Sequence, residues 1–196
     1  MIVLNAGKVD LIEYMGGDAA VIRNARRCWR SESRGEDSDQ KLINHLISKR
    51  HMTPFEAMVF TFDVKAPIFV ARQWFRHRVG SFNEVSLRYC AANREFYVPD
   101  SGDVGMQAWH EVMNKCMDTY EAYLKFLPKE QARSLLPIGL YTEFYWTVNG
   151  SSLLNFLDLR TDKSAQFETR VYAQAIVELV TEVAPMTIKS WHEFRV

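Results

Sequence analysis

The stretch MVFTFDVKAPIFVARQWFRH, residues 58–77, decides the fold of this chain. Its first half alternates apolar residues with polar or small ones at a period of two, which is typical of a half-buried strand. Pro67 then stands at a favoured first position of a helix, and the following ten residues have helical apolar spacing. We therefore predict a strand that leads directly into a helix with arginines near its end. The alternating residues are Met58, Phe60, Phe62 and Val64.

Upstream of this stretch, the sequence predicts one strand and two helices. Residues 9–15 have the composition of a short strand, and a helix is expected at 18–30 with Asp18 as its N-cap. The segment SESRGEDSD, residues 31–39, is the most polar of the chain and predicts a loop. A second amphipathic helix is expected at 42–51.

Downstream, helices dominate the pattern. Residues 140–148 are so rich in aromatic and β-branched side chains that a strand and a helix both remain open there. No repeat or linker divides the chain, so we expect one α+β domain over residues 1–196, dominated by helices. The other expected elements are an extended run at 95–98, a loop at 100–105, a long helix at 104–127, short helices between Pro128 and Leu136, a helix from Ser151 or Ser152 to Arg160, one from Ser164 to about Val183, and a last short helix.

Composition excludes a disordered tail protein, a collagen-like repeat and a small disulfide-stabilised protein. With 196 residues, 47% of them hydrophobic, the chain is long and apolar enough to bury a core. Lys and Arg total 24 against 24 Asp and Glu, so no global field draws it to nucleic acid or to a membrane surface. An export signal and an apolar run of spanning length are both lacking, and we expect a cytoplasmic protein.

Three cysteines without a CxxC pair indicate neither a disulfide framework nor a thiolate zinc site. Cys28, Cys90 and Cys116 are expected to be small buried hydrophobes or bystanders. The histidines show no metal-ligand spacing, and no metal site is predicted.

Positive charge gathers locally between Arg72 and Tyr89, where Glu84 is the sole acid. Arg72 and Arg76 are one helical turn apart, and Arg78 and Arg88 follow. Arginine forks match phosphate oxygens, and crowded guanidinium groups repel one another unless an anion binds between them. The cluster predicts a phosphorylated ligand, and the alternative is that these arginines pair with distant acids or cover an exposed helix.

Aromatic and short polar residues are interleaved with the arginines. Trp74, Phe75 and Phe82 imply partial burial of the cluster, and buried guanidinium groups need partners. The polar residues offer hydrogen bonds of both senses, so a nucleotide is the most economical ligand. These polar residues are Ser81, Asn83, Glu84 and Ser86.

Residues 76–89, RHRVGSFNEVSLRY, resemble the signature of the flavin-dependent thymidylate synthases. In that signature RHR is followed after seven residues by a serine, with NE before it and RY after it. The likeness extends over most of residues 10–190. The further matching segments are His51, 53–56 (TPFE), 65–75 (KAPIFVARQWF), Arg133, 135–137 (LLP), 140–142 (LYT), 146–149 (WTVN), 155–157 (NFL) and 159–160 (LR).

The resemblance implies a helix-rich α+β fold with a central antiparallel sheet and a homotetramer with four sites at subunit junctions. It implies reductive methylation of dUMP to dTMP, with methylene-tetrahydrofolate as one-carbon donor and NADPH as reductant through bound FAD. No metal is implied, and no cysteine nucleophile, since none of the cysteines follows a proline as in the cysteine-dependent thymidylate synthases. The residues implied to hold FAD are Arg76, His77, Arg78, Thr53 from a neighbouring subunit, Glu84, Asn149, Ser151 and Asn155.

For the nucleotide, the resemblance implies two residues with chemical roles. Arg160 would lie against the uracil edge, where a permanently charged guanidinium stabilises negative charge developing on the ring. Ser86 lacks an activating triad and would orient the substrate rather than attack it. His51 and Tyr89 would border the folate side, although His51 is equally well explained as a residue at a helix C-terminus. The residues implied to contact dUMP are Gln73, Trp74, Phe75, Arg76, Glu84, Val85, Ser86, Leu87, Arg88, Arg133 and Arg160.

Two positions depart from the family pattern. Ser151 stands where relatives often place an arginine, and Ser164 where many have a histidine. Both exchanges bear on how tightly FAD is held. Two other functions stay open: a nucleic-acid-binding module that uses Trp74 and Phe82 as stacking platforms, and a flavin- or nucleotide-binding regulatory protein without turnover.

Overall fold

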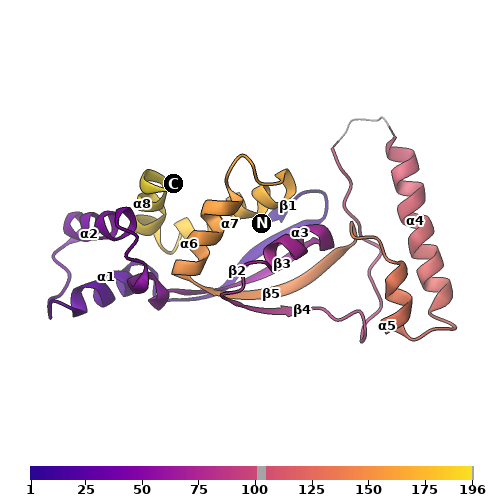
Figure 1. The fold of residues 1–196 in the computed structure, drawn as a ribbon, viewed down its shortest axis with the longest axis horizontal. Coiled ribbons are helices and arrows are strands. Elements are labelled where there is room, and N and C mark those ends of the chain that lie inside the picture. Colours follow the sequence, from indigo (N-terminus) through magenta and orange to yellow (C-terminus); the bar gives the residue numbers. More distant parts are fainter. Residues whose placement is uncertain (101–104, 196) are drawn as a thin grey trace.

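The computed structural model describes residues 1–100 and 105–195, and an antiparallel sheet runs through its centre (Figure 1). The sheet order is β1-β2-β3-β5-β4. The strands are β1 (Ile2–Val3), β2 (Gly7–Met15), β3 (Val59–Pro67), β4 (Ser81–Glu84) and β5 (Tyr141–Asn149). The α+β class and the central antiparallel sheet are confirmed. The extent of the single domain stays a prediction.

The segment at 140–148 is a strand. Residues of β5 pair with β3 along its whole length, from Val59 opposite Asn149 to Pro67 opposite Tyr141. Alternate β5 residues are buried, as expected for a strand with one face on a core. Strand β4, which the polar segment after Gly80 did not predict, is paired to the far edge of β5. That edge position explains why β4 reads as a polar segment.

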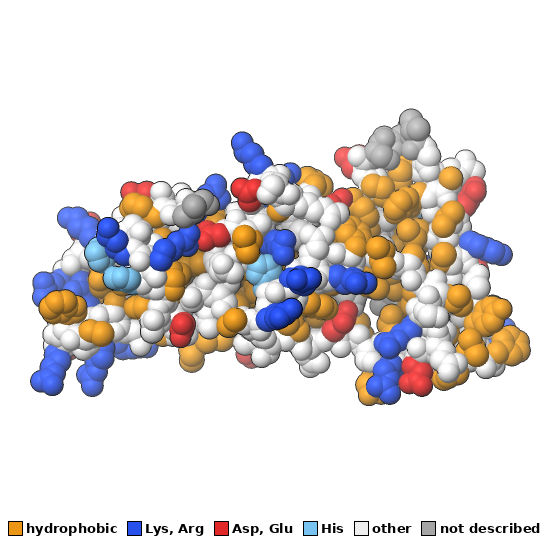
Figure 2. Space-filling view, viewed as in Figure 1, with side chains coloured by type: hydrophobic (Ala, Val, Ile, Leu, Met, Phe, Trp, Pro, Cys, Tyr) orange, Lys and Arg blue, Asp and Glu red, His pale blue; other side chains and the backbone are white. Residues whose placement is uncertain are grey.

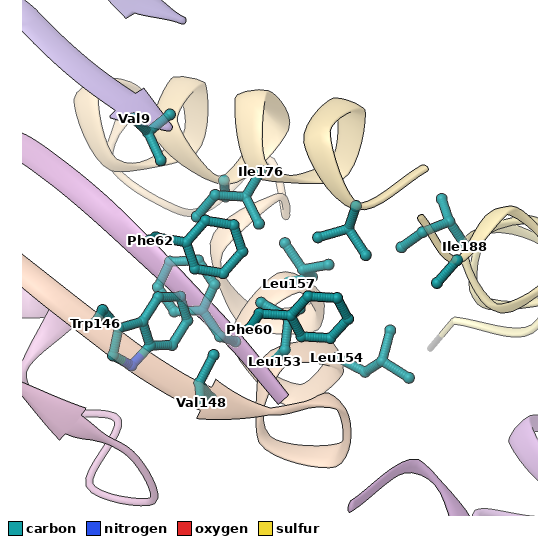
Figure 3. Close-up of a cluster of buried hydrophobic side chains, with 14 of the residues drawn as sticks. Val9, Phe60, Phe62, Trp146, Val148, Leu153, Leu154, Leu157, Ile176 and Ile188 are labelled. Atoms are coloured by element: carbon teal, nitrogen blue, oxygen red, sulfur yellow. The ribbon is translucent and has the colours of Figure 1, made fainter. Parts of the chain in front are cut away.

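Three helices cover one face of the sheet: α3 (Ile68–Trp74), α6 (Gly150–Arg160) and α7 (Phe167–Thr181) (Figure 1). Between them and the strands lies the main core, where Phe60, Phe62 and Trp146 meet side chains of α6 and α7 (Figure 3). Gly150 allows α6 to start close to the preceding strand, since a Cβ there would lie 2.6 Å from the carbonyl oxygen of Phe55.

Further helices lie at the two ends of the sheet (Figure 1). At one end, α1, α2 and α8 pack together, and a buried ion pair joins Arg26 of α1 to Asp39 of α2 at 2.6 Å. At the other end, α4 and α5 enclose a small separate core around Met117 and Tyr120. These elements are α1 (Gly17–Arg27), α2 (Glu36–Ser48), the 3-10 turn η1 (Thr53–Ala57), α4 (Met106–Tyr123), α5 (Lys129–Ala132), the 3-10 turn η2 (Arg133–Leu135) and α8 (Pro185–Phe194).

Several predicted helix starts are corrected. Asp18 lies inside α1, and its carboxylate accepts hydrogen bonds from the backbone of Met186 and Thr187, so it caps α8 instead. Helix α2 starts at Glu36 within the polar segment, because acids in a first turn favour the positive end of the helix dipole. Asn149 caps α6 by accepting from the Ser152 amide at 2.9 Å, in place of a serine.

Two expectations at the helix ends also change. Helix α7 starts at Phe167, since Ser164 is held in a turn by the carboxylate of Asp162. Helix α4 ends four residues before the expected boundary at 127. The predicted loop at 100–105 falls mostly outside the described residues. No helix in the described part of the chain is long and apolar enough to cross a membrane.

Candidate functional site

A hollow of about 590 Å³ lies between α6 and the segment that follows α3. Its volume is within the range of small-molecule sites, about 300–1,000 Å³. Figure 2 shows Lys and Arg side chains gathered around a histidine near the middle of the molecule. The lining residues are Arg50, Met52, Arg76, His77, Arg78, Val79, Ser151, Ser152, Asn155, Leu159 and Arg160.

Helix α3 is fixed by the burial of one of its faces in the core, and this fixes the position of the RHR segment that follows it. Val70, Ala71 and Trp74 are fully buried, and the Trp74 ring lies between Phe156 at 4.9 Å and Trp146 at 5.3 Å. After Trp74 the helix ends in a turn, in which the His77 amide donates to the Trp74 carbonyl at 3.0 Å. Arg76, His77 and Arg78 therefore follow directly after the helix and line the hollow.

Arg160 and His77 form the central contact of the site. Arg160 Nε donates to His77 Nε2 at 3.0 Å, and Arg160 Nη2 donates to the Gln73 carbonyl at 3.2 Å. Because Nε2 accepts this hydrogen bond, the imidazole is neutral with its proton on Nδ1. Burial and the neighbouring Arg160 cation lower the pKa of His77 to about 4. The Arg160 guanidinium stays charged, although burial lowers its pKa.

This arrangement predicts how His77 titrates. We expect the ring signal of His77 in NMR spectra to titrate with a midpoint near pH 4. The unfolded chain takes up this proton near pH 6.5, so the His77 term lowers folding stability as the pH falls from about 6.5 to about 4. A His77→Gln variant identifies the signal. A midpoint near 6.5 would contradict the neutral, Arg160-bonded imidazole.

Positive charge dominates the wall of the hollow. Arg76 and Arg78 have no ion-pair partner among the residues that the structure describes. Arg50 pairs with Asp158 at 3.0 Å. Guanidinium groups held close together without matching acids favour a bound anion such as phosphate. The alternative that the RHR arginines pair with distant acids is therefore wrong for Arg76 and Arg78 within the described chain.

A second group of predicted residues lies away from the hollow, with Ser86, Leu87 and Arg88 on the loop after β4 and Arg133 at the start of η2. Arg88 Nε donates to the Glu130 carboxylate at 3.3 Å, and Arg133 Nε donates to the Glu130 carbonyl at 3.3 Å. Ser86 Oγ accepts from the Arg88 amide, and Leu87 packs against the small core beside α4. None of these residues lines the hollow within one chain. The predicted nucleotide contacts thus separate into two groups.

Other predicted residues lie between or beside these groups. Gln73 Nε2 donates to the Gln166 side chain at 2.5 Å, next to the Arg160 contact. The Glu84 carboxylate accepts from Thr142 at 2.7 Å, and the Val85 amide donates to the Glu143 carbonyl. Asn149 uses its side chain as the α6 cap, while Thr53 lies exposed at the start of η1.

Of the aromatic residues of the cluster, Trp74 belongs to the core, and Phe75 and Phe82 pack against it partly buried. Trp74 is 0% exposed, so a contact with the nucleotide would have to come from its backbone, and that contact stays a prediction. Phe75 packs edge-on against Phe82 and Phe144. The Phe82 ring is parallel to Trp146 at 6.1 Å. Trp74 therefore cannot serve as a base-stacking platform, as the nucleic-acid alternative requires, whereas Phe82 is partly buried and packs against Trp146.

The exposed aromatic residue near the second group is Tyr89, with the Arg88 guanidinium 5.7 Å from the ring centroid. His51 follows the end of α2, where its amide donates to the Leu46 carbonyl. Cys28 and Cys90 are exposed and Cys116 is partly exposed, so they are not small buried hydrophobes, and the alternative that they are bystanders stays a prediction. Within the described residues no group of three His, Cys, Asp or Glu side chains could hold a metal ion.

Sequence reasoning missed Arg50, Met52, Val79, Ser152 and Leu159 as lining residues. Val79 and Leu159 adjoin predicted residues, and Ser152 follows Ser151, so proximity alone could have suggested them. Arg50 and Met52 lie in the segment after α2 and flank the predicted His51, but His51 was assigned to the folate side, so their approach to the RHR hollow was not foreseen.

The hollow combines four arginines, of which Arg76 and Arg78 have no ion-pair partner among the described residues, with a neutral histidine, on a helix-covered antiparallel sheet; this donor set suits a phosphorylated cofactor or substrate. The family model described as "Thymidylate synthase complementing protein" matches residues 10–186. The flavin-dependent thymidylate synthase of Thermotoga neapolitana is 43% identical over 202 residues, covering 98% of this chain and 94% of its own length. That of Thermus thermophilus is 40% identical, with 97% of this chain and 77% of its own length covered.

Solved structures agree with these relatives. The UMP/dUMP methylase PolB from Streptomyces cacaoi, bound with 5-Br dUMP, superposes with a TM-score of 0.90 at 28% identity. The match covers 100% of this chain and 98% of that one. The chain belongs to the flavin-dependent thymidylate synthase family.

Proposed function

We propose that the hollow and the second group of predicted residues, Ser86, Leu87, Arg88 and Arg133, together form the active site of a thymidylate synthase. The chain is an FAD-dependent methyltransferase that converts dUMP to dTMP, as its family membership states. The observation that carries the assignment of the site is the convergence of Arg76, Arg78 and Arg160 around a neutral His77. Such a site suits a phosphorylated flavin next to a pyrimidine monophosphate.

The donor set of the hollow fits FAD. Arg76 and Arg78 are unpaired forks suited to the pyrophosphate, and the exposed Asn155 amide offers both a donor and an acceptor to a ring edge. When bound, FAD supplies the redox chemistry of the reaction. Around it, we assign Arg76, His77, Arg78, Ser151 and Asn155 from one chain. Thr53, Glu84 and Asn149 belong to the same proposed set, with Thr53 coming from a neighbouring subunit.

Two separated groups of nucleotide contacts support a site completed by a second copy of the chain. Gln73 and Arg160 lie at the hollow, whereas Ser86, Arg88 and Arg133 lie beside α5. Figure 1 places α5 at one end of the molecule and α6 over the sheet. The proposed homotetramer, with sites at subunit junctions, would bring the two groups to one nucleotide. The remaining proposed contacts are Phe75, Arg76, Glu84, Val85 and Leu87, with Trp74 through its backbone.

Arg160 has the chemical role in this proposal. His77 and the Gln73 carbonyl hold its guanidinium in a fixed orientation, which saves the cost of ordering it during the reaction. Since His77 is neutral, it accepts from Arg160 and adds no competing positive charge. A fixed cation at the pyrimidine edge stabilises negative charge developing on the ring, without a covalent enzyme adduct. Methylene-tetrahydrofolate and NADPH are the proposed co-substrates, with His51 and Tyr89 on the folate side. The cytoplasmic location stays a prediction.

Ser86→Ala tests the orienting role of the serine. We expect the KM for dUMP to rise about tenfold, the value of one hydrogen bond to a charged group, while kcat falls much less. Steady-state kinetics with varied dUMP measure both values, and Cys90→Ala serves as a neighbouring control with wild-type kinetics. Complete inactivity of Ser86→Ala with intact dUMP binding would indicate a nucleophilic serine.

An omission assay tests the function as a whole. The purified chain is incubated with dUMP, methylene-tetrahydrofolate, FAD and NADPH, each left out in turn, and dTMP is measured. We expect product only with the complete mixture, together with a flavin absorbance band in the loaded protein. A protein that binds FAD and dUMP yet forms no dTMP would favour the regulatory alternative. A colourless protein that does not bind dUMP would overturn the proposal.

A further inference from the structure

Arg50 is a cation on the wall of the hollow to which the proposed function assigns no role. It comes from the turn after α2, far in sequence from RHR and from α6. Three of the four arginines at this hollow belong to segments already expected to bind ligand, namely Arg76, Arg78 and Arg160. The presence of Arg50 at the hollow is therefore not accounted for by those segments.

The backbone at Arg50 has a left-handed conformation that usually belongs to glycine. Its φ is +55°, its amide donates to the Ile47 carbonyl, and the next amide donates to the Leu46 carbonyl. This is the Schellman arrangement of a helix C-terminus, with Arg50 at the position where glycine is preferred. Arg30, with φ +47°, ends α1 with the same pair of hydrogen bonds. The conformation alone therefore does not explain Arg50, but it provides a matched comparison.

The side-chain contacts distinguish Arg50 from Arg30. Arg50 Nη1 donates to Asp158 Oδ2 at 3.0 Å, and the other oxygen of Asp158 accepts from the Trp191 indole at 2.6 Å. Asp158 is 14% exposed and Trp191 is buried, so the acid is fixed by the core. Arg30 makes no side-chain hydrogen bond or ion pair with the described residues and does not line the hollow. Asp158 thus fixes the Nη1 end of the Arg50 guanidinium.

The rest of the Arg50 fork is available to a ligand. Among the described residues only Nη1 has a partner, which leaves Nε and Nη2 on a side chain that is 47% exposed at the hollow. A guanidinium with one edge held by a carboxylate is pre-oriented, so less side-chain entropy is lost when the free edge binds an oxyanion. Asp158 balances one of the four positive charges, and three remain to attract a polyanion.

We propose that Arg50 binds the pyrophosphate of FAD together with Arg76 and Arg78, and that Asp158 positions it. The inference rests on the proposed function, which places the flavin in this hollow. It adds a pyrophosphate ligand from outside the RHR segment. It also links cofactor affinity to the packing of α2, α6 and α8, because Arg50, Asp158 and Trp191 come from the end of α2, from α6 and from α8.

Arg50→Gly separates this role from a structural one, because glycine suits the left-handed backbone and removes only the side chain. Flavin fluorescence is titrated with the flavin-free protein, using FAD and riboflavin. We expect the Kd for FAD to rise about tenfold, the loss of one charge-assisted contact at a partly exposed site. The Kd for riboflavin, which has no phosphate, is expected to change less than twofold. Thermal unfolding of the flavin-free variant should stay at the wild-type temperature or above it.

Arg30→Gly is the matched control, with wild-type affinity for both flavins. Asp158→Asn is expected to weaken FAD binding less than Arg50→Gly, because the guanidinium remains but loses its anchor. Unchanged FAD affinity in Arg50→Gly, an equal loss for riboflavin, or a loss for dUMP instead would each overturn the inference. If the wild-type protein bound no FAD, the proposed function would fail rather than this assignment alone.

Discussion

Replacing Arg160 with alanine is expected to lower kcat/KM for dTMP formation by about 10²- to 10³-fold, with FAD still bound. This magnitude is typical for the loss of one fixed donor that faces developing charge. The structural reason is that Arg160 is oriented from two sides, by His77 Nε2 at 3.0 Å and by the Gln73 carbonyl at 3.2 Å. FAD is retained because Arg76, Arg78 and Asn155 remain on the wall of the hollow. Steady-state kinetics and the flavin absorbance band give the two readouts.

Two further measurements make the Arg160 prediction specific. Arg160→Lys keeps the charge but loses the planar fork, so it is expected to recover only part of the activity. In Arg160→Ala the pKa of His77 should rise above about 4, because the neighbouring cation that lowers it is gone. Loss of the flavin from Arg160→Ala, with normal turnover after reloading, would show that the residue serves the cofactor and not the pyrimidine.

Trp74→Ala is expected to destabilise the fold by about 3–5 kcal/mol, as do other truncations of large buried aromatic residues. Trp74 is fully buried and contacts Phe144, Trp146, Phe156 and Tyr172. Because domains of this kind are stable by only about 5–15 kcal/mol, the loss is a large part of the total. Urea unfolding followed by circular dichroism measures it.

Trp74→Phe serves as the matched control for this position. Phenylalanine keeps much of the ring packing, and the Trp74 indole NH has no hydrogen-bond partner in the described structure, so no hydrogen bond is lost. We expect a destabilisation of less than about half that of the alanine variant and an unchanged Kd for dUMP. Wild-type stability combined with much weaker dUMP binding would instead place the Trp74 side chain at the nucleotide.

Helix termini show where local sequence signals were insufficient. Asp18 has the residue type and position of an N-cap, yet its carboxylate caps α8, 168 residues further along the chain. The polar segment before Leu42 looks like a loop, but the acids at its end favour the first turn of α2. Only Asp18 found its capping partner through the tertiary fold, which a local pattern does not report. The start of α2 follows from acids in its own first turn, a local signal that the polar composition of the segment masked.

Local sequence was enough to predict a strand through residues 58–64 and a helix after it, which are found as β3 and α3, and an anion-binding role for RHR, because a burial period and a run of like charges are properties of consecutive residues. It could not distinguish which aromatic residues of the cluster face a ligand and which face the core. The packing of distant segments buries Trp74, joins Arg160 to His77 by a hydrogen bond across 83 residues, and brings Arg50 to the same hollow. The reason is physical: burial and charge pairing depend on which segments pack together, and long-range packing is absent from any short stretch of sequence.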